Sequence, residues 1–111
     1  MSKHIIVLAF SLFASSAFAE VNCNKQGSKA KVERCFKQQI AEKKEALEEY
    51  DESITTSSNI PMDVKARVHA GYQSFMRNIY KTCPDLECVN LAMKDQIQDM
   101  YDETSQFTVP Q

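Results

Sequence analysis

The chain of 111 residues contains no tryptophan, only two glycines and only three prolines. Glycine and proline mark turns, so their scarcity argues against a fold of many short strands joined by tight turns. No stretch alternates apolar and polar residues as a half-buried strand does, whereas apolar residues recur at spacings of three and four. The composition therefore predicts an all-α protein.

The chain also lacks an excess of basic residues. It has 13 Lys and Arg against 15 Asp and Glu, which gives a formal net charge of −2. Because binding to nucleic acid depends on a strongly basic surface, we expect no nucleic-acid partner.

The chain has no long hydrophobic run, although a short one lies near its beginning. A basic start precedes a mostly apolar run over residues 5–13, and residues 17–19 (Ala-Phe-Ala) form a small-x-small cleavage motif. The run is too short to span the roughly 30 Å of a bilayer core. We predict a signal peptide over residues 1–19, cleaved after Ala19, and a periplasmic protein with one domain over residues 20–111 and no membrane span after cleavage.

Three apolar stripes with helical spacing follow the predicted signal peptide. The first contains one lysine, Lys43, among the apolar residues Val32, Cys35, Phe36, Ile40, Leu47, Tyr50 and Ile54. The second contains Val64, Val68, Tyr72, Phe75, Met76, Ile79 and Cys83. The third contains Leu86, Val89, Met93, Ile97, Met100 and Phe107. We expect the segment from Val64 to Cys88 to be the one around which the rest of the chain is organised.

Residues that favour helix starts precede each stripe. Ser28 is a predicted N-cap, and Pro61 suits the first turn of the second helix. Pro84 suits the first position of the third helix, with an acidic residue, Asp85, beside it.

All four cysteines, Cys23, Cys35, Cys83 and Cys88, lie after the predicted signal peptide. An even count in a small exported chain predicts two disulfides. No C-x-x-C is present and only one histidine, His69, follows the signal peptide, so we expect neither a metal site nor thiol exchange.

Four cysteines allow three pairings. The helical rise would bring Cys35 and Cys83 to the same end of an antiparallel hairpin, where both lie on apolar stripes. We therefore predict Cys35–Cys83, which leaves Cys23–Cys88, while the local pairing of Cys23–Cys35 and Cys83–Cys88 is the alternative. The expected fold is a small disulfide-braced three-helix domain built on an antiparallel helical hairpin.

The cysteine layout resembles that of the LprI-type lysozyme-inhibitor family, whose N-terminal module is a small exported helical domain. Cys23 and Cys35 match the family's first cysteine pair. Cys83 and Cys88 match the cysteine at the end of its second helix and the one that follows soon after. The resemblance covers the chain from Cys23 to about Tyr101 and implies a helical fold and inhibition of lysozyme.

The side-chain motifs of that family are matched in part. Tyr50 falls on the tyrosine of its Leu-Asn-x-x-Tyr element, and Phe75 stands where the family has tryptophan. The family's Arg-Asp pair would fall at Ile79 and Tyr80 and is missing.

Charge is segregated along the chain. Residues 25–44 hold seven basic and two acidic residues, whereas residues 45–63 hold six acidic residues and none that is basic. Because the third predicted helix runs back to the same end, seven carboxylates would gather there. They belong to Glu48, Glu49, Asp51, Glu52, Asp99, Asp102 and Glu103. Such a patch would steer a basic protein partner, and lysozymes are commonly basic, although an ordinary solvated surface is the alternative.

The sequence contains no catalytic constellation. His69 has no free cysteine nucleophile to activate, and Ser74 near it lacks a glycine-rich elbow. We therefore expect a protein that is not an enzyme and has no cofactor. The leading hypothesis is a periplasmic binding protein that inhibits a lysozyme-like cell-wall hydrolase by occlusion. The alternatives are an immunity protein against a toxin delivered to the periplasm, and a structural or envelope-stress accessory protein.

Overall fold

The computed structural model describes residues 20–108. Its elements are a short 3₁₀ turn, η1 (Cys23–Lys25), and three long helices, α2 (Lys29–Thr56), α3 (Met62–Thr82) and α4 (Leu86–Thr108). Within the described range there is no strand, so the predicted all-α, three-helix fold is confirmed. The predicted signal peptide lies outside the described residues.

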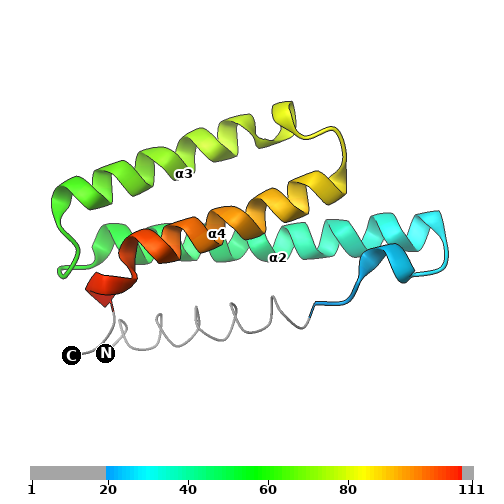
Figure 1. Ribbon diagram of the computed structural model, residues 1–111, viewed down its shortest axis with the longest axis horizontal. Coiled ribbons are helices and arrows are strands. Elements are labelled where there is room, and N and C mark those ends of the chain that lie inside the picture. Colours follow the sequence, from blue (N-terminus) through cyan, green and yellow to red (C-terminus); the bar gives the residue numbers. More distant parts are fainter. Residues whose placement is uncertain (1–19, 109–111) are drawn as a thin grey trace.

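Successive helices run in opposite directions: in Figure 1, α2 runs from right to left, α3 from left to right and α4 from right to left. α2 and α3 form the predicted antiparallel hairpin, and α4 lies parallel to α2 and antiparallel to α3. The most extensive contact is between α2 and α4, and α3 touches both of them less. The expectation that the chain is organised around the second helix is therefore wrong, because α2 and α4 form the main interface.

Local capping explains where two of the helices begin. Ser28 has extended backbone, and its Oγ accepts a hydrogen bond from a backbone N–H three residues further on, at 3.2 Å. At the start of α4, Asp85 Oδ1 accepts a hydrogen bond from the Cys88 N–H at 2.9 Å. Asp85 therefore caps α4, and Pro84 precedes the helix instead of opening it as the sequence predicted.

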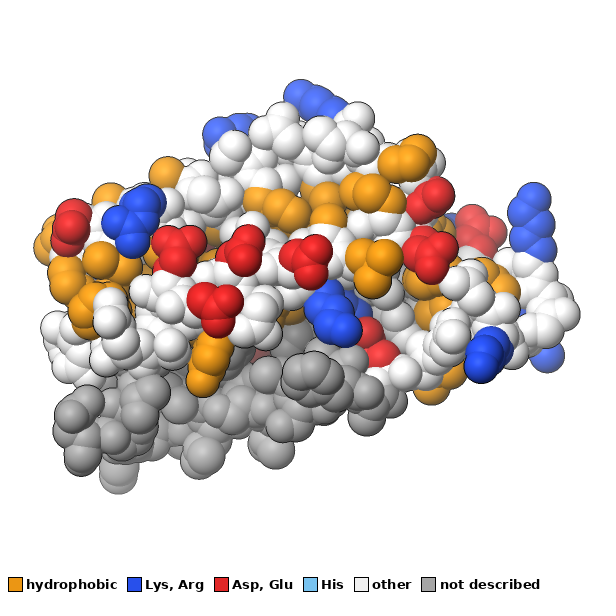
Figure 2. Space-filling model, viewed as in Figure 1, with side chains coloured by type: hydrophobic (Ala, Val, Ile, Leu, Met, Phe, Trp, Pro, Cys, Tyr) orange, Lys and Arg blue, Asp and Glu red, His pale blue; other side chains and the backbone are white. Residues whose placement is uncertain are grey.

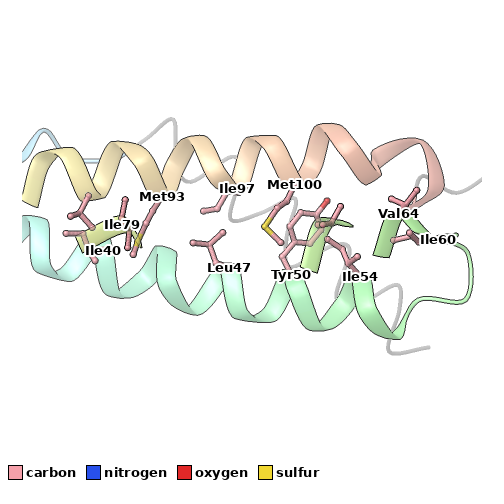
Figure 3. Packing of buried hydrophobic residues seen from close by; sticks show 12 residues of the cluster. Ile40, Leu47, Tyr50, Ile54, Ile60, Val64, Ile79, Met93, Ile97 and Met100 are labelled. Atoms are coloured by element: carbon pink, nitrogen blue, oxygen red, sulfur yellow. The ribbon is translucent and has the colours of Figure 1, made fainter. Parts of the chain in front are cut away.

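The core is one apolar cluster in which side chains of α2 and α4 meet, with a smaller contribution from the α2–α3 connection and α3 (Figure 3). Its buried members are Ile40, Leu47, Tyr50, Ile54, Ile60, Val64, Val68, Ile79, Val89, Met93, Ile97 and Met100. Almost all of them belong to the three predicted stripes. The periodicity of the sequence thus identified the core.

The disulfides do not follow the predicted pairing. Cys23 is bonded to Cys35 and Cys83 to Cys88, each with a Cα–Cα distance of 5.4 Å. The prediction of Cys35–Cys83 and Cys23–Cys88 is therefore wrong, and the local alternative is the one the structure contains. The N-terminal lead-in (residues 20–28) is tied to α2, and the end of α3 is tied to the start of α4.

Cys35 does not pair with Cys83 because its side chain lies on the wrong flank of α2, although the two cysteines lie at matching positions along the hairpin. Twenty-one positions separate Cys35 from the end of α2 at Thr56, and the same number separate the start of α3 from Cys83. However, Cys35 shares a flank of α2 with Gln39, whose Nε2 donates to the Val21 carbonyl at 2.8 Å. That flank faces the lead-in and α4, on nearly the opposite side of α2 from the flank that faces α3.

Candidate functional site: an acidic surface on α2 and α4

The second half of α2 and the second half of α4 lie at the same end of the bundle, because these two helices are parallel (Figure 1). A buried hydrogen bond joins them there, between Tyr50 Oη and Thr104 Oγ1 at 2.8 Å. The two groups of carboxylates that the sequence singled out are therefore brought to one end of the molecule.

On α2, three of the four predicted residues are exposed: Glu48, Glu49 and Glu52. None of the three forms a salt bridge within residues 20–108. Their charges therefore face solvent and are available to a partner.

Asp51 behaves differently from its neighbours. It is buried, and His69 Nδ1 of α3 lies 2.9 and 3.0 Å from its two carboxylate oxygens. Asp51 thus fixes α3 to α2 and does not contribute to the exposed surface. The same contact gives His69 a structural position.

On α4, the predicted residues Asp99, Asp102 and Glu103 are all exposed. Glu103 Oε2 is 3.4 Å from Arg67 Nε of α3, and Asp102 Oδ1 accepts a hydrogen bond from Gln98 Nε2 at 2.9 Å. Asp99 forms no salt bridge within the described part of the chain.

Sequence reasoning missed one member of this group. Asp95 is exposed and lies four residues before Asp99, which in turn lies three before Asp102. This spacing puts all three on one outward face of α4, and it could have been read from the sequence. Figure 2 shows carboxylates lying in a row across the face of the molecule on which α4 is in front. We call the exposed set the acidic surface, and its members are Glu48, Glu49, Glu52, Asp95, Asp99, Asp102 and Glu103.

Two tyrosines, the buried Tyr50 and the half-buried Tyr72, respond to the nearby carboxylates. Burial raises the pKa of Tyr50 to about 12, and Asp102 adds to the effect. The pKa of Tyr72 on α3 is also raised, first by burial and then by Glu48 and Asp51. Glu48 and Asp51 of α2 therefore lie close to one flank of α3, while Glu103 of α4, which contacts Arg67, lies on the other, so the acidic surface comprises two groups of carboxylates.

Two large apolar side chains of α4 are exposed near these charges. Leu91 is 54% exposed and lies four residues before Asp95, and Tyr101 is 40% exposed beside Asp102. In Figure 2, apolar side chains lie between and beside the carboxylates. Exposed aromatic and aliphatic groups surrounded by charge are typical of a protein-binding surface.

Within residues 20–108, no three His, Cys, Asp or Glu side chains are grouped so that they could hold a metal ion. In the same range, no helix has both the length and the apolar character required to cross a membrane.

Comparison with known proteins gives no assignment, because no family model, curated protein or solved structure matches the chain. The class that the structure defines is a small all-α protein of three helices with two disulfides. The resemblance to the LprI-type family remains a prediction from the sequence.

Proposed function

We propose that this is an exported, non-enzymatic binding protein that inhibits a lysozyme-like cell-wall hydrolase by occlusion, with the acidic surface as its contact region. One observation carries the proposal. The exposed carboxylates of the acidic surface extend from Asp95, near the middle of α4, to the end of the bundle where α2 and α4 finish, and of them only Glu103 forms a salt bridge within residues 20–108.

Electrostatic attraction explains how such a surface would find its target. Carboxylates of one sign raise the rate at which a basic protein approaches in a productive orientation. Lysozyme-like hydrolases are commonly basic, so their surface is complementary in charge. Charge alone gives little lasting affinity, because exposed ion pairs each stabilise by only about 0–1 kcal/mol.

Apolar contact is needed to hold the complex, and the same surface offers it. Leu91 and Tyr101 project from α4 next to the carboxylates. Buried aromatic and aliphatic groups at the centre of an interface contribute most of its binding free energy. In the proposed complex the carboxylates steer the approach, and these two side chains limit dissociation.

The covalent structure supports a location outside the cytoplasm. Both cysteine pairs are oxidised, and disulfides persist in oxidising compartments such as the periplasm. Cell-wall hydrolases act in that compartment. The resemblance to the lysozyme-inhibitor family, carried by the four cysteines, points to the same class of target.

The experiment compares two double variants of α2 that change the charge equally. The test variant is Glu49→Gln/Glu52→Gln, and the control is Glu33→Gln/Glu42→Gln, whose residues are exposed on the same helix but lie nearer its start. We expect the test variant to associate with a basic lysozyme about tenfold more slowly, and the control to change much less. The dissociation rate should change little in both.

Two further measurements test the proposal: the dependence of association on salt concentration, and the identity of the protein that binds. Raising the salt concentration from 0.1 M to 1 M shortens the Debye length from about 10 Å to about 3 Å, so association of the unmutated protein should slow. Inhibition that is insensitive to both salt and substitution would contradict the role of the acidic surface. If no lysozyme binds, and capture from periplasm followed by mass spectrometry returns a toxin, the hydrolase target is wrong and the immunity alternative holds.

A further inference from the structure

Lys43 is the one charged residue in the first apolar stripe, and its side chain is completely buried between α2, α4 and the lead-in. Its Nζ donates to the Asn90 Oδ1 of α4 at 3.0 Å and forms an ion pair with the carboxylate of Glu20. No role for this position was expected from the sequence. In the structure it is the centre of a buried polar cluster.

Two amides extend the cluster. Asn90 Nδ2 donates to Gln39 Oε1 at 2.8 Å, and Gln39 Nε2 donates to the Val21 carbonyl oxygen at 2.8 Å. Gln39 and Asn90 are both buried, so the cluster is shielded from water. We call Gln39, Lys43 and Asn90 the Lys43 site.

The groups that complete the Lys43 site come from the lead-in. Residues from Cys23 onward are anchored, because Cys23 is bonded to Cys35 and Asn24 Nδ2 donates to Glu87 Oε2 at 2.9 Å. Once the predicted signal peptide is removed, only residues 20–22 precede Cys23, and Val21 is largely exposed. The Glu20 side chain is 23% exposed, whereas that of Lys43 is 1% exposed. Glu20 therefore reaches the site from the outside, on a short tether.

The energetics of burial require an anion beside Lys43. A buried ammonium group without a counter-ion is strongly unfavourable, and an apolar residue at position 43 would fill the same space without that penalty. Lys43 instead presents its ammonium group to the anion, while Asn90 Oδ1 accepts a hydrogen bond from Lys43 Nζ and Asn90 Nδ2 donates to Gln39 Oε1, so the two amides hold the ammonium group in place. The anion beside the ammonium group here is the carboxylate of Glu20.

We propose that Gln39, Lys43 and Asn90 form a carboxylate-binding site that the protein fills with its own Glu20, so that residues 20–22 act as a tethered ligand. The site accepts a free carboxylate anion when the Glu20 side chain is removed. The α2–α4 interface is then complete only while a carboxylate, tethered or free, occupies the site. This inference does not depend on the proposed function, because the Lys43 site is buried and is separate from the acidic surface.

The test is chemical rescue of a Glu20→Ala variant by acetate. The full 111-residue chain is expressed in a Gram-negative host, and intact mass establishes which residue begins the exported product. Relative to the unmutated protein, we expect Glu20→Ala to melt about 10 °C lower or more. Sodium acetate should restore most of that difference in a saturable way, whereas sodium chloride at the same ionic strength should not.

Two further variants distinguish binding of acetate at the Lys43 site from a general effect of salt on stability. Glu20→Ala/Lys43→Met lacks the ammonium group and should gain nothing specific from acetate. Glu33→Gln/Lys37→Met removes an exposed ion pair of α2 and should melt close to the unmutated protein. If Glu20→Ala is unfolded without acetate, the rescue is followed instead as recovery of helical circular dichroism.

Three results would overturn the proposed carboxylate-binding site. One is a Glu20→Ala variant that melts at the same temperature as the unmutated protein. Another is an equal gain from acetate and chloride, or from acetate with and without Lys43. A third is an unfolded Glu20→Ala variant whose helical signal acetate does not restore.

Discussion

The interface between α2 and α4 is buried much more completely than the face of α3 that packs on it. The side chains with almost no exposure all belong to α2 and α4, and they are Lys43, Leu47, Ile54, Met93, Met100 and Thr104. On α3 only Val64, Val68 and Ile79 are buried. Tyr72, Phe75 and Met76 belong to the same stripe but remain half-buried.

The difference shows that a regular apolar stripe does not by itself give complete burial. All three stripes have helical spacing, yet their burial depends on how closely the neighbouring helices approach. α3 is held to the other helices largely by half-buried side chains, by the hydrogen bond between His69 and Asp51, and by the ion pair between Arg67 and Glu103. We therefore expect α3 to open locally before the α2–α4 interface does.

The largest expected difference is between two methionines, one in each region. Met93→Ala in the α2–α4 interface should lower the free energy of unfolding by about 3–4 kcal/mol, because Met93 is fully buried. Met76→Ala on α3 removes the same atoms from a half-buried position and should lower it by about 1 kcal/mol. Urea denaturation of both variants measures the difference, and equal losses would contradict the comparison.

Removing each disulfide in turn should affect a different part of the molecule, because one bond holds α3 to α4 and the other holds the lead-in to α2. Removing Cys83–Cys88 as a Ser/Ser pair should lower the free energy of unfolding by about 2 kcal/mol, and removing Cys23–Cys35 by about 3 kcal/mol, in the chain-entropy model. Only the first should speed amide hydrogen exchange throughout α3, because Cys83 and Cys88 join α3 to α4. Non-reducing peptide mapping verifies both bonds, and faster exchange in α2 on loss of Cys83–Cys88 would contradict this assignment.

Alkaline pH should weaken the α2–α4 interface through Tyr50. The pKa of Tyr50 is about 12 in the folded protein against 10.0 for a free tyrosine, so the unfolded chain loses this proton first as pH rises. The stabilisation is fully present below pH 10 and disappears as pH rises through about 12, with a total of about 2–3 kcal/mol.

Tyr50→Phe supplies the control for this pH dependence. It cannot ionise, so its free energy of unfolding should decline less steeply between about pH 10 and 12 than that of the unmutated protein. At neutral pH it should be less stable by about 1 kcal/mol, because the hydrogen bond to Thr104 is lost. Denaturant titrations at a series of pH values measure both effects, and parallel pH profiles would show that Tyr50 is not responsible.

The smallest expected effects concern the two polar side-chain contacts of α3, His69 with Asp51 and Arg67 with Glu103. His69→Ala leaves the buried Asp51 carboxylate without this partner and should lower the free energy of unfolding by about 1–2 kcal/mol. Arg67→Ala breaks an exposed pair and should change it by less than about 0.5 kcal/mol. Thermal unfolding measures the loss of stability in each variant. A larger loss for Arg67→Ala than for His69→Ala would show that the Arg67–Glu103 contact, and not the His69–Asp51 contact, contributes more to holding α3.

Much of the fold could be predicted because it depends on local rules. The spacing of residues such as Leu47, Val68 and Met93 gave the three helices and their core faces, and Ser28 gave the start of α2. The exposed residues of the acidic surface followed from the same periodicity. These features need only the geometry of a single helix.

The remaining features depend on how the helices pack, which the sequence does not state. The pairing of Cys35 required knowing which flank of α2 faces α3. Asp51 looked like its exposed neighbours, but it lies on the flank that faces α3 and contacts His69. Lys43 looked like an interruption of the stripe, because its counter-ion, Glu20, is 23 positions away in the chain.

The parallel course of α2 and α4 also brings two helix dipoles into line. Each helix has a partial negative charge of about half an elementary charge at its C-terminus, from carbonyl groups without intrahelical partners. Neither α2 nor α4 has a basic residue in its last turn to offset it, whereas α3 has Lys81. The end of the bundle next to the acidic surface is therefore more negative than its carboxylates alone make it, and that part of the field persists when every one of them is neutralised.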